Sequence, residues 1–145
     1  MYKRILLAYD GSVSGQKALL DCRDIAQWSQ ASLTLIAVTP LYMELSGAEG
    51  GIYDRSLAER EKEKYQEILE QGLRQLAESG HQASGEVMLG DTVDEITKYA
   101  LRIEADLIVV GHKHLEGWAV RWWRGSVSKS LIEHAPCSVL VVMTN

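Results

Sequence analysis

The chain has 145 residues, of which 46% are hydrophobic and 24% are charged. This length suits one domain of common size, and the composition excludes an intrinsically disordered chain. The formal net charge of −5 argues against a dedicated nucleic-acid binder, which usually presents a basic face. The apolar runs have the length of strands, far short of the roughly 20 residues that a membrane-spanning helix needs. We therefore expect a cytoplasmic protein without nucleic-acid or membrane partners.

Apolar runs alternate with stretches of helical periodicity along the chain. Runs without polar alternation, which are typical of strands buried on both faces, are predicted at 5–9, 33–38, 86–89, 107–110 and 139–142. Helices are predicted around 18–26, from 55 to 79, from 93 to 103 and after Ser126. Ser12 and either Asp91 or Thr92 would cap helices, and Gly80 would end one. This order predicts a single α/β domain over 1–145, a doubly wound five-stranded parallel sheet with helices on both faces.

Ligands of such a sheet bind outside the carboxyl ends of the strands, where the strand order reverses. Gly111 would let the backbone approach a ligand, and Gly125 and Ser126 would offer N–H groups and a hydroxyl to a phosphate. Asp10 would repel a phosphate but suits a ribose hydroxyl or an adenine amino group, so the set suggests a nucleotide. The same residues would also serve as plain caps and strand ends in a domain that binds nothing.

The segment from Asp106 to Val142, which ends in GSVS and HAPCSVLVV, resembles the universal stress protein family, as do AYDGS at 8–12 and GD at 90–91. The resemblance covers essentially the whole chain. It implies a Rossmann-like fold of the adenine nucleotide alpha hydrolase type and a homodimer. In one branch of the family it also implies an ATP-type nucleotide, held by a loop of the pattern G-x-x-G, nine residues, G-[ST].

This chain departs from that loop pattern at two points. Gly111 matches the first glycine and Gly125-Ser126-Val127 match its end, but His114 replaces the second glycine and ten residues separate it from Gly125. The expected ligand is ATP, ADP or AMP, with or without Mg²⁺, and the tighter loop suits AMP best. The predicted cofactor site comprises Ala8, Tyr9, Asp10, Val38, Val110, Gly111, His114, Gly125, Ser126 and Val127.

Catalytic machinery is not visible in the sequence. There is no P-loop and no G-x-S-x-G elbow, and His112 and His114 lack a third ligand for a metal. The cysteines, Cys22 and Cys137, have no C-x-x-C spacing and are expected to be reduced and inert. We therefore expect a regulatory or stress-response module with at most a weak ATPase activity.

An alternative function is a ligand-free protein-interaction module of the same fold. Segment 112–124 is rich in Trp, Arg and His, which suits either a protein contact or a clamp for a base and phosphates. Segment 41–53 is long enough for a lid or a partner contact. A homodimer is also predicted through strand 138–142, because an apolar strand at a sheet edge invites antiparallel pairing with its copy. That pairing would be prevented if the strand were interior or shielded by 41–53.

Overall fold

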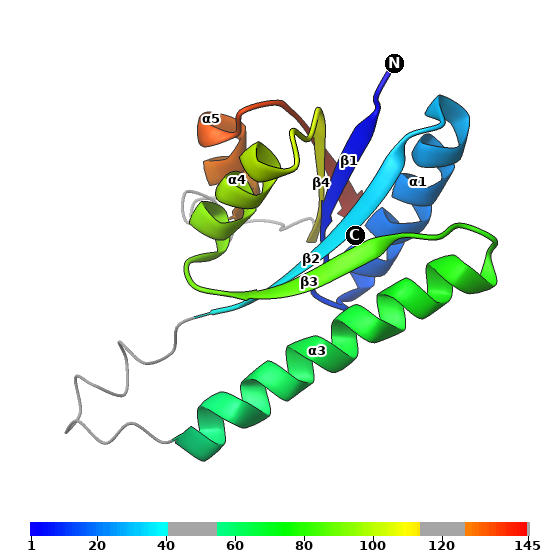
Figure 1. Ribbon diagram of the computed structural model, residues 1–145. Helices are drawn as coiled ribbons and strands as arrows, with labels where there is room; N and C mark the ends of the chain where they lie inside the picture. Colours follow the sequence, from blue (N-terminus) through cyan, green and yellow to red (C-terminus); the bar gives the residue numbers. More distant parts are fainter. Residues whose placement is uncertain (41–54, 114–126, 145) are drawn as a thin grey trace.

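The computed structural model describes residues 1–40, 55–113 and 127–144, and it shows one parallel sheet between two layers of helices (Figure 1). The strands are β1 (Arg4–Ala8), β2 (Ser32–Thr39), β3 (Ser84–Leu89), β4 (Leu107–Lys113) and β5 (Ser138–Thr144). The helices are α1 (Val13–Ser29), α3 (Arg55–Glu78), α4 (Thr92–Arg102) and α5 (Val127–His134). The predicted single-domain α/β fold with five parallel strands and helices on both faces is confirmed.

The strand order is β3-β2-β1-β4-β5, so the chain builds the sheet outward from β1 in two directions. It first adds β2 and β3 on one side and then returns to add β4 and β5 on the other. Because parallel crossovers are right-handed, crossovers made in opposite directions place their helices on opposite faces. Accordingly α1 and α3 cover one face and α4 and α5 cover the other (Figure 1).

The side chains of the strands alternate between two apolar clusters, one on each face of the sheet. On β2, Leu33, Leu35 and Ala37 join the cluster under α1 and α3, whereas Ile36 and Val38 join the cluster under α4 and α5. Strand β1 lies in the middle of the sheet, and Ile5, Leu6 and Leu7 have no exposed surface. A strand covered on both faces needs apolar residues at every position, which explains its unbroken apolar run.

Local signals in the sequence set the ends of two helices. Ser12 caps α1, since its hydroxyl accepts a hydrogen bond from the Gly15 N–H at 3.0 Å. Gly80 ends α3 with a φ of 83°, while the His81 N–H donates to the Leu76 carbonyl at 2.9 Å. This is the Schellman arrangement, in which the left-handed residue is usually glycine. Both ends agree with the sequence-based expectation.

Strand β4 runs further than the sequence predicts. Its apolar run ends at Val110, yet residues Gly111, His112 and Lys113 continue the ladder by pairing with Val142, Met143 and Thr144 of β5. The central strand β1 ends earlier, with its last pair between Ala8 and Val110. Strand β4 thus extends beyond its neighbour β1, and the loop that the sequence places from Gly111 onward begins later.

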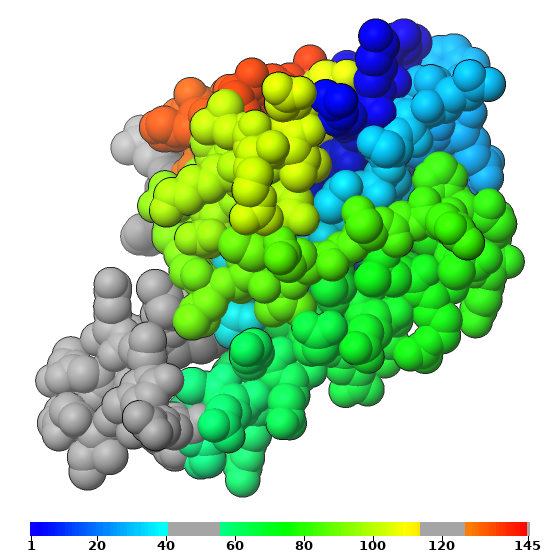
Figure 2. Space-filling view, in the orientation of Figure 1, coloured from blue at the N-terminus to red at the C-terminus, as the bar shows by residue number. Residues whose placement is uncertain are grey.

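The surface shows the same layers as the ribbon. In Figure 2, α3 occupies the lower part of the visible face, whereas α4 and α5 lie toward the upper left. Within the described ranges, no helix is both long and apolar enough to span a membrane. Of the two segments predicted as partner contacts, 41–53 lies outside the described residues, and 112–124 does so from residue 114 onward, since His112 and Lys113 belong to β4.

Glycine 72 of α3 provides a test of how closely this helix packs on the sheet. A Cβ there would lie 2.8 Å from Cε2 of Tyr9 and 3.0 Å from Cδ2 of Leu35. Gly→Ala in an exposed helix usually stabilises by about 0.5–1 kcal/mol, but overpacking costs about 1–3 kcal/mol. We expect Gly72→Ala to lower the free energy of unfolding, measured by urea denaturation. The exposed neighbour provides the control: Gln71→Ala should change it by less than about 0.5 kcal/mol, and a stabilised Gly72→Ala would refute the packing.

Candidate functional site

A pocket of about 210 Å³, which we call the strand-edge pocket, lies at the carboxyl ends of the strands. It is next to the point where the strand order reverses between β1 and β4. This is the position at which open parallel sheets bind ligands. Its described lining comes from β1, β2 and β4, from the residues that follow β1 and β2, and from three helices. It comprises Ala8, Tyr9, Asp10, Ile36, Val38, Pro40, Tyr65, Thr92, Ile96, Val110, Gly111, Val127 and Ser128.

The floor of the pocket is apolar. Ile36, Val38, Ile96 and Val110 belong to the core cluster under α4 and α5, and each is less than 9% exposed. A flat aromatic group placed there would cover apolar surface at the end of the core, which is favourable. The pocket can therefore hold a base-sized apolar ring.

Among the described lining residues, Asp10 is the one carboxylate, and it lies just after β1. Its Oδ1 accepts hydrogen bonds from the Ser12 N–H at 3.0 Å and from the Ser12 hydroxyl at 2.6 Å. Gly15 makes room for this carboxylate, because a Cβ there would lie 2.6 Å from Oδ1. Since only Oδ1 makes these bonds, the second oxygen can accept from an amino or hydroxyl group of a ligand.

Gly111 lines the pocket with its backbone, but its missing side chain serves another contact. A Cβ at this position would lie 2.3 Å from the carbonyl oxygen of Ser14 and 2.7 Å from the Gly15 nitrogen. The glycine is therefore required for β4 to lie against the first turn of α1. We predicted it from the close approach of a ligand, and the structure adds this packing reason.

The first turn of α5 closes the pocket on the side of β4. Val127 and Ser128 lie there, and helices leave the N–H groups of the first turn without partners inside the helix. Ser128 is 3% exposed, and its Oγ lies 3.2 Å from Nδ1 of His112. The partial positive charge of a helix start suits an anion at this end of the pocket.

Burial raises the pKa of Tyr9, which lines the pocket, and of the two cysteines, which do not. Burial, followed by the nearby Asp10 carboxylate, raises the pKa of Tyr9, so this phenol stays neutral. Burial raises the pKa of the Cys22 thiol to about 12, with a smaller effect from Asp21. Burial also raises the pKa of Cys137. The expectation of inert thiols fits these environments, since the thiolate is the reactive form.

Most of the predicted site residues come together in this pocket, namely Ala8, Tyr9, Asp10, Val38, Val110, Gly111 and Val127. Three others, His114, Gly125 and Ser126, lie outside the described residues. Sequence analysis missed Ile36, Pro40, Tyr65, Thr92, Ile96 and Ser128. Ile36 shares a strand face with Val38, and Ser128 belongs to the quoted GSVS string, so both had a usable signal. Tyr65 had none, because its position depends on how α3 lies across the sheet.

The chain thus forms a doubly wound parallel α/β fold with a pocket at the switch point. It matches the model of the universal stress protein family over residues 1–143. It is 34% identical, over 99% of its length and 85% of the relative's, to a Staphylococcus aureus (strain USA300) protein that bears the universal stress protein name. The chain belongs to the universal stress protein family.

Solved structures share the fold over nearly the whole chain. A universal stress family protein from Burkholderia pseudomallei superposes with a TM-score of 0.77 at 25% identity, covering 97% of this chain and 96% of its own. An Arabidopsis thaliana family member with AMP bound gives a TM-score of 0.73 at 21% identity, covering 99% of this chain and 92% of its own. A universal stress protein in complex with cAMP gives a TM-score of 0.70 at 23% identity, covering 99% of this chain and 98% of its own.

The hydroxyl of Ser12 joins the Asp10 carboxylate to the start of α1, and its removal tests that link. We expect Ser12→Ala to destabilise the fold by about 1 kcal/mol, the usual cost of losing an N-cap. Chemical denaturation measures the change, and Ser138→Ala at an exposed strand start is the control. Equal stability of the two variants would show that the cap contributes nothing.

Proposed function

We propose that this protein binds an adenine nucleotide in the strand-edge pocket and acts as a regulatory module with little or no turnover. The observation that carries the proposal is the combination of an apolar floor, one rim carboxylate and a helix start in a single pocket at the switch point. The base lies on Val38 and Val110, and the phosphate lies against the first turn of α5. His114, Gly125 and Ser126 stay sequence-based predictions for the phosphate end.

Charge sets this orientation of the ligand. The first turn of α5 carries no acidic residue, so it can receive a phosphate. Asp10 lines the same pocket and would repel a phosphate, but it accepts from an amino group or a ribose hydroxyl. Family members crystallised with AMP, with cAMP and with dAMP support an adenine nucleotide as the ligand class.

Calorimetry with AMP, ADP, ATP and cAMP, each with and without Mg²⁺, tests the proposal. We expect at least one of them to bind with a Kd of about 100 μM or tighter, equivalent to about −5.5 kcal/mol. Asp10→Asn keeps the size of the side chain but removes its charge, and should weaken binding about tenfold. Asp24→Asn is the matched control, since Asp24 is exposed on α1 and pairs with Arg23. Absence of binding by every nucleotide would contradict the proposal.

We also propose a homodimer formed through β5. In the described sheet this strand lies at the edge and pairs only with β4. Val139, Leu140 and Val141 are half-buried, and they divide between the two core clusters. An apolar edge strand with open backbone groups favours pairing with a copy of itself, and a two-fold axis makes that pairing antiparallel.

Charge introduced at either edge of the sheet distinguishes the two possible edges for dimerisation. We expect Val141→Lys to yield a monomer or an aggregate, because it replaces an apolar side chain of the edge strand by a charged one. Ser84→Lys on the opposite edge strand, β3, should remain a dimer. Analytical ultracentrifugation at micromolar concentration measures both. A wild type that is already monomeric there, or a monomeric Ser84→Lys, would rule out the β5 interface.

A further inference from the structure

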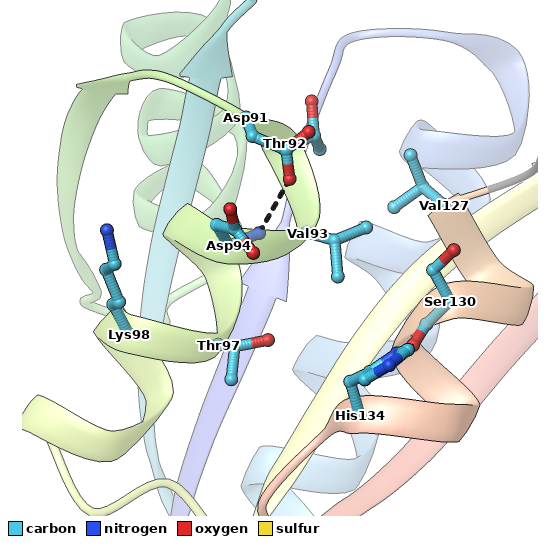
Figure 3. A pocket seen from close by; sticks show the side chains of 9 residues that line it. All are labelled: Asp91, Thr92, Val93, Asp94, Thr97, Lys98, Val127, Ser130 and His134. Carbon is cyan, nitrogen blue, oxygen red and sulfur yellow. Dashed lines mark hydrogen bonds between the residues drawn. The ribbon is translucent and has the colours of Figure 1, made fainter.

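A second cavity, of about 640 Å³, lies between α4 and α5 on the face of the sheet that these helices cover. We refer to it as the α4–α5 groove. Figure 3 shows Val93 and Thr97 of α4 pointing toward α5, with Val127, Ser130 and His134 opposite. Lys98 also lines the cavity, but its side chain extends to the other side of α4 (Figure 3). The central part of the groove is thus lined by hydroxyl, imidazole and aliphatic groups.

The groove adjoins the strand-edge pocket. Thr92 and Val127, the first residues of α4 and α5, line both cavities. The strand-edge pocket alone, at about 210 Å³, is smaller than the roughly 300–1,000 Å³ of ordinary small-molecule sites. A ligand whose base fills that pocket therefore reaches the groove by passing between the two helix starts.

The charges along this path separate an anionic section from a neutral one. At the start of α5 the first turn holds no acidic side chain, so a phosphate group is stabilised there. The start of α4 carries Asp94 and Glu95, and Asp91 caps it by accepting from the Asp94 N–H at 3.0 Å. Carboxylates on this side of the groove disfavour additional phosphates beyond those at α5.

The interior of the groove offers hydrogen bonds to an uncharged partner. Thr97 Oγ1 is buried and has no hydrogen-bond partner among the described residues, a state that costs free energy. His134 Nδ1 lies 2.9 Å from the Ser130 carbonyl, which can only accept, so Nδ1 carries the proton. In the neutral ring Nε2 is then an acceptor. A sugar hydroxyl can donate to Nε2, and rotation of the Thr97 side chain about χ1 brings its hydroxyl into the groove, where a second sugar hydroxyl can pair with it.

We propose that the α4–α5 groove binds the uncharged, hydroxyl-rich second part of a nucleoside diphosphate conjugate, such as ADP joined to a sugar. This proposal rests on nucleotide binding in the strand-edge pocket and specifies which class of nucleotide the protein prefers. The base occupies the pocket, the diphosphate crosses at the start of α5, and the sugar contacts Thr97 and His134. A ligand with a third phosphate in place of the sugar meets the carboxylates of α4 instead.

Calorimetry with ADP, ADP-ribose and ATP tests the proposal on the full chain. We expect ADP-ribose to bind about tenfold tighter than ADP or ATP, a difference of about 1.4 kcal/mol. Thr97→Val removes one hydroxyl at nearly constant size and should reduce ADP-ribose affinity to that of ADP, leaving ADP unchanged. Ser130→Ala, a second variant in the groove, should also weaken ADP-ribose binding and leave ADP binding unchanged. The control is Thr34→Val, because Thr34 does not line the groove. It lies on β2, where its Oγ1 is 3.4 Å from the Ser84 Oγ.

The possible outcomes separate this inference from the proposed function. If ADP binds but ADP-ribose binds no tighter, or if Thr97→Val leaves their affinity ratio unchanged, the groove proposal is overturned and nucleotide binding stands. If no nucleotide binds, both are overturned. Loss of a buried hydroxyl without a partner should not destabilise the fold, so an unaltered or higher Tm for Thr97→Val confirms that its binding defect is local.

Discussion

The central position of β1 in the parallel sheet is the constraint on which the rest of the molecule depends. Ile5, Leu6 and Leu7 are fully buried, and β1 pairs with β2 on one side and β4 on the other. Because the right-handed crossovers run in one direction from β1 to β3 and in the opposite direction from β3 to β5, the helices divide between the two faces. That division leaves the strand ends next to β1 uncovered by a crossover, and the pocket lies there.

Close backbone contacts turn this general position into a defined site. Gly111 brings β4 against Ser14 and Gly15 in the first turn of α1, and Gly15 admits the Asp10 carboxylate beside Ser12. These contacts hold Asp10 and Gly111 against elements that pack into the core. A site held in this way needs little rearrangement to bind, which preserves affinity that ordering would otherwise cost.

The sequence predicted those features whose physical cause is local. The unbroken apolar run of β1, the Ser12 cap and the Gly80 helix end each depend on neighbouring residues, and each was found. The carboxyl ends of the strands also converge as expected, because parallel order alone dictates it. Features that depend on how helices lie across the sheet escaped prediction: Tyr65 and Ile96 in the pocket, and the α4–α5 groove. The extension of β4 was missed because pairing with β5, not the apolar pattern, sustains it.

The central claim is that a nucleotide binds at the strand ends with its phosphate at α5. Backbone amide NMR during titration with AMP tests it most directly, because it reports the location of binding as well as its occurrence. The account predicts shifts confined to the lining of the strand-edge pocket, largest at Asp10, Gly111 and Ser128. Shifts concentrated on the outer surface of α1 or along β3, or no shifts at millimolar nucleotide, would contradict it.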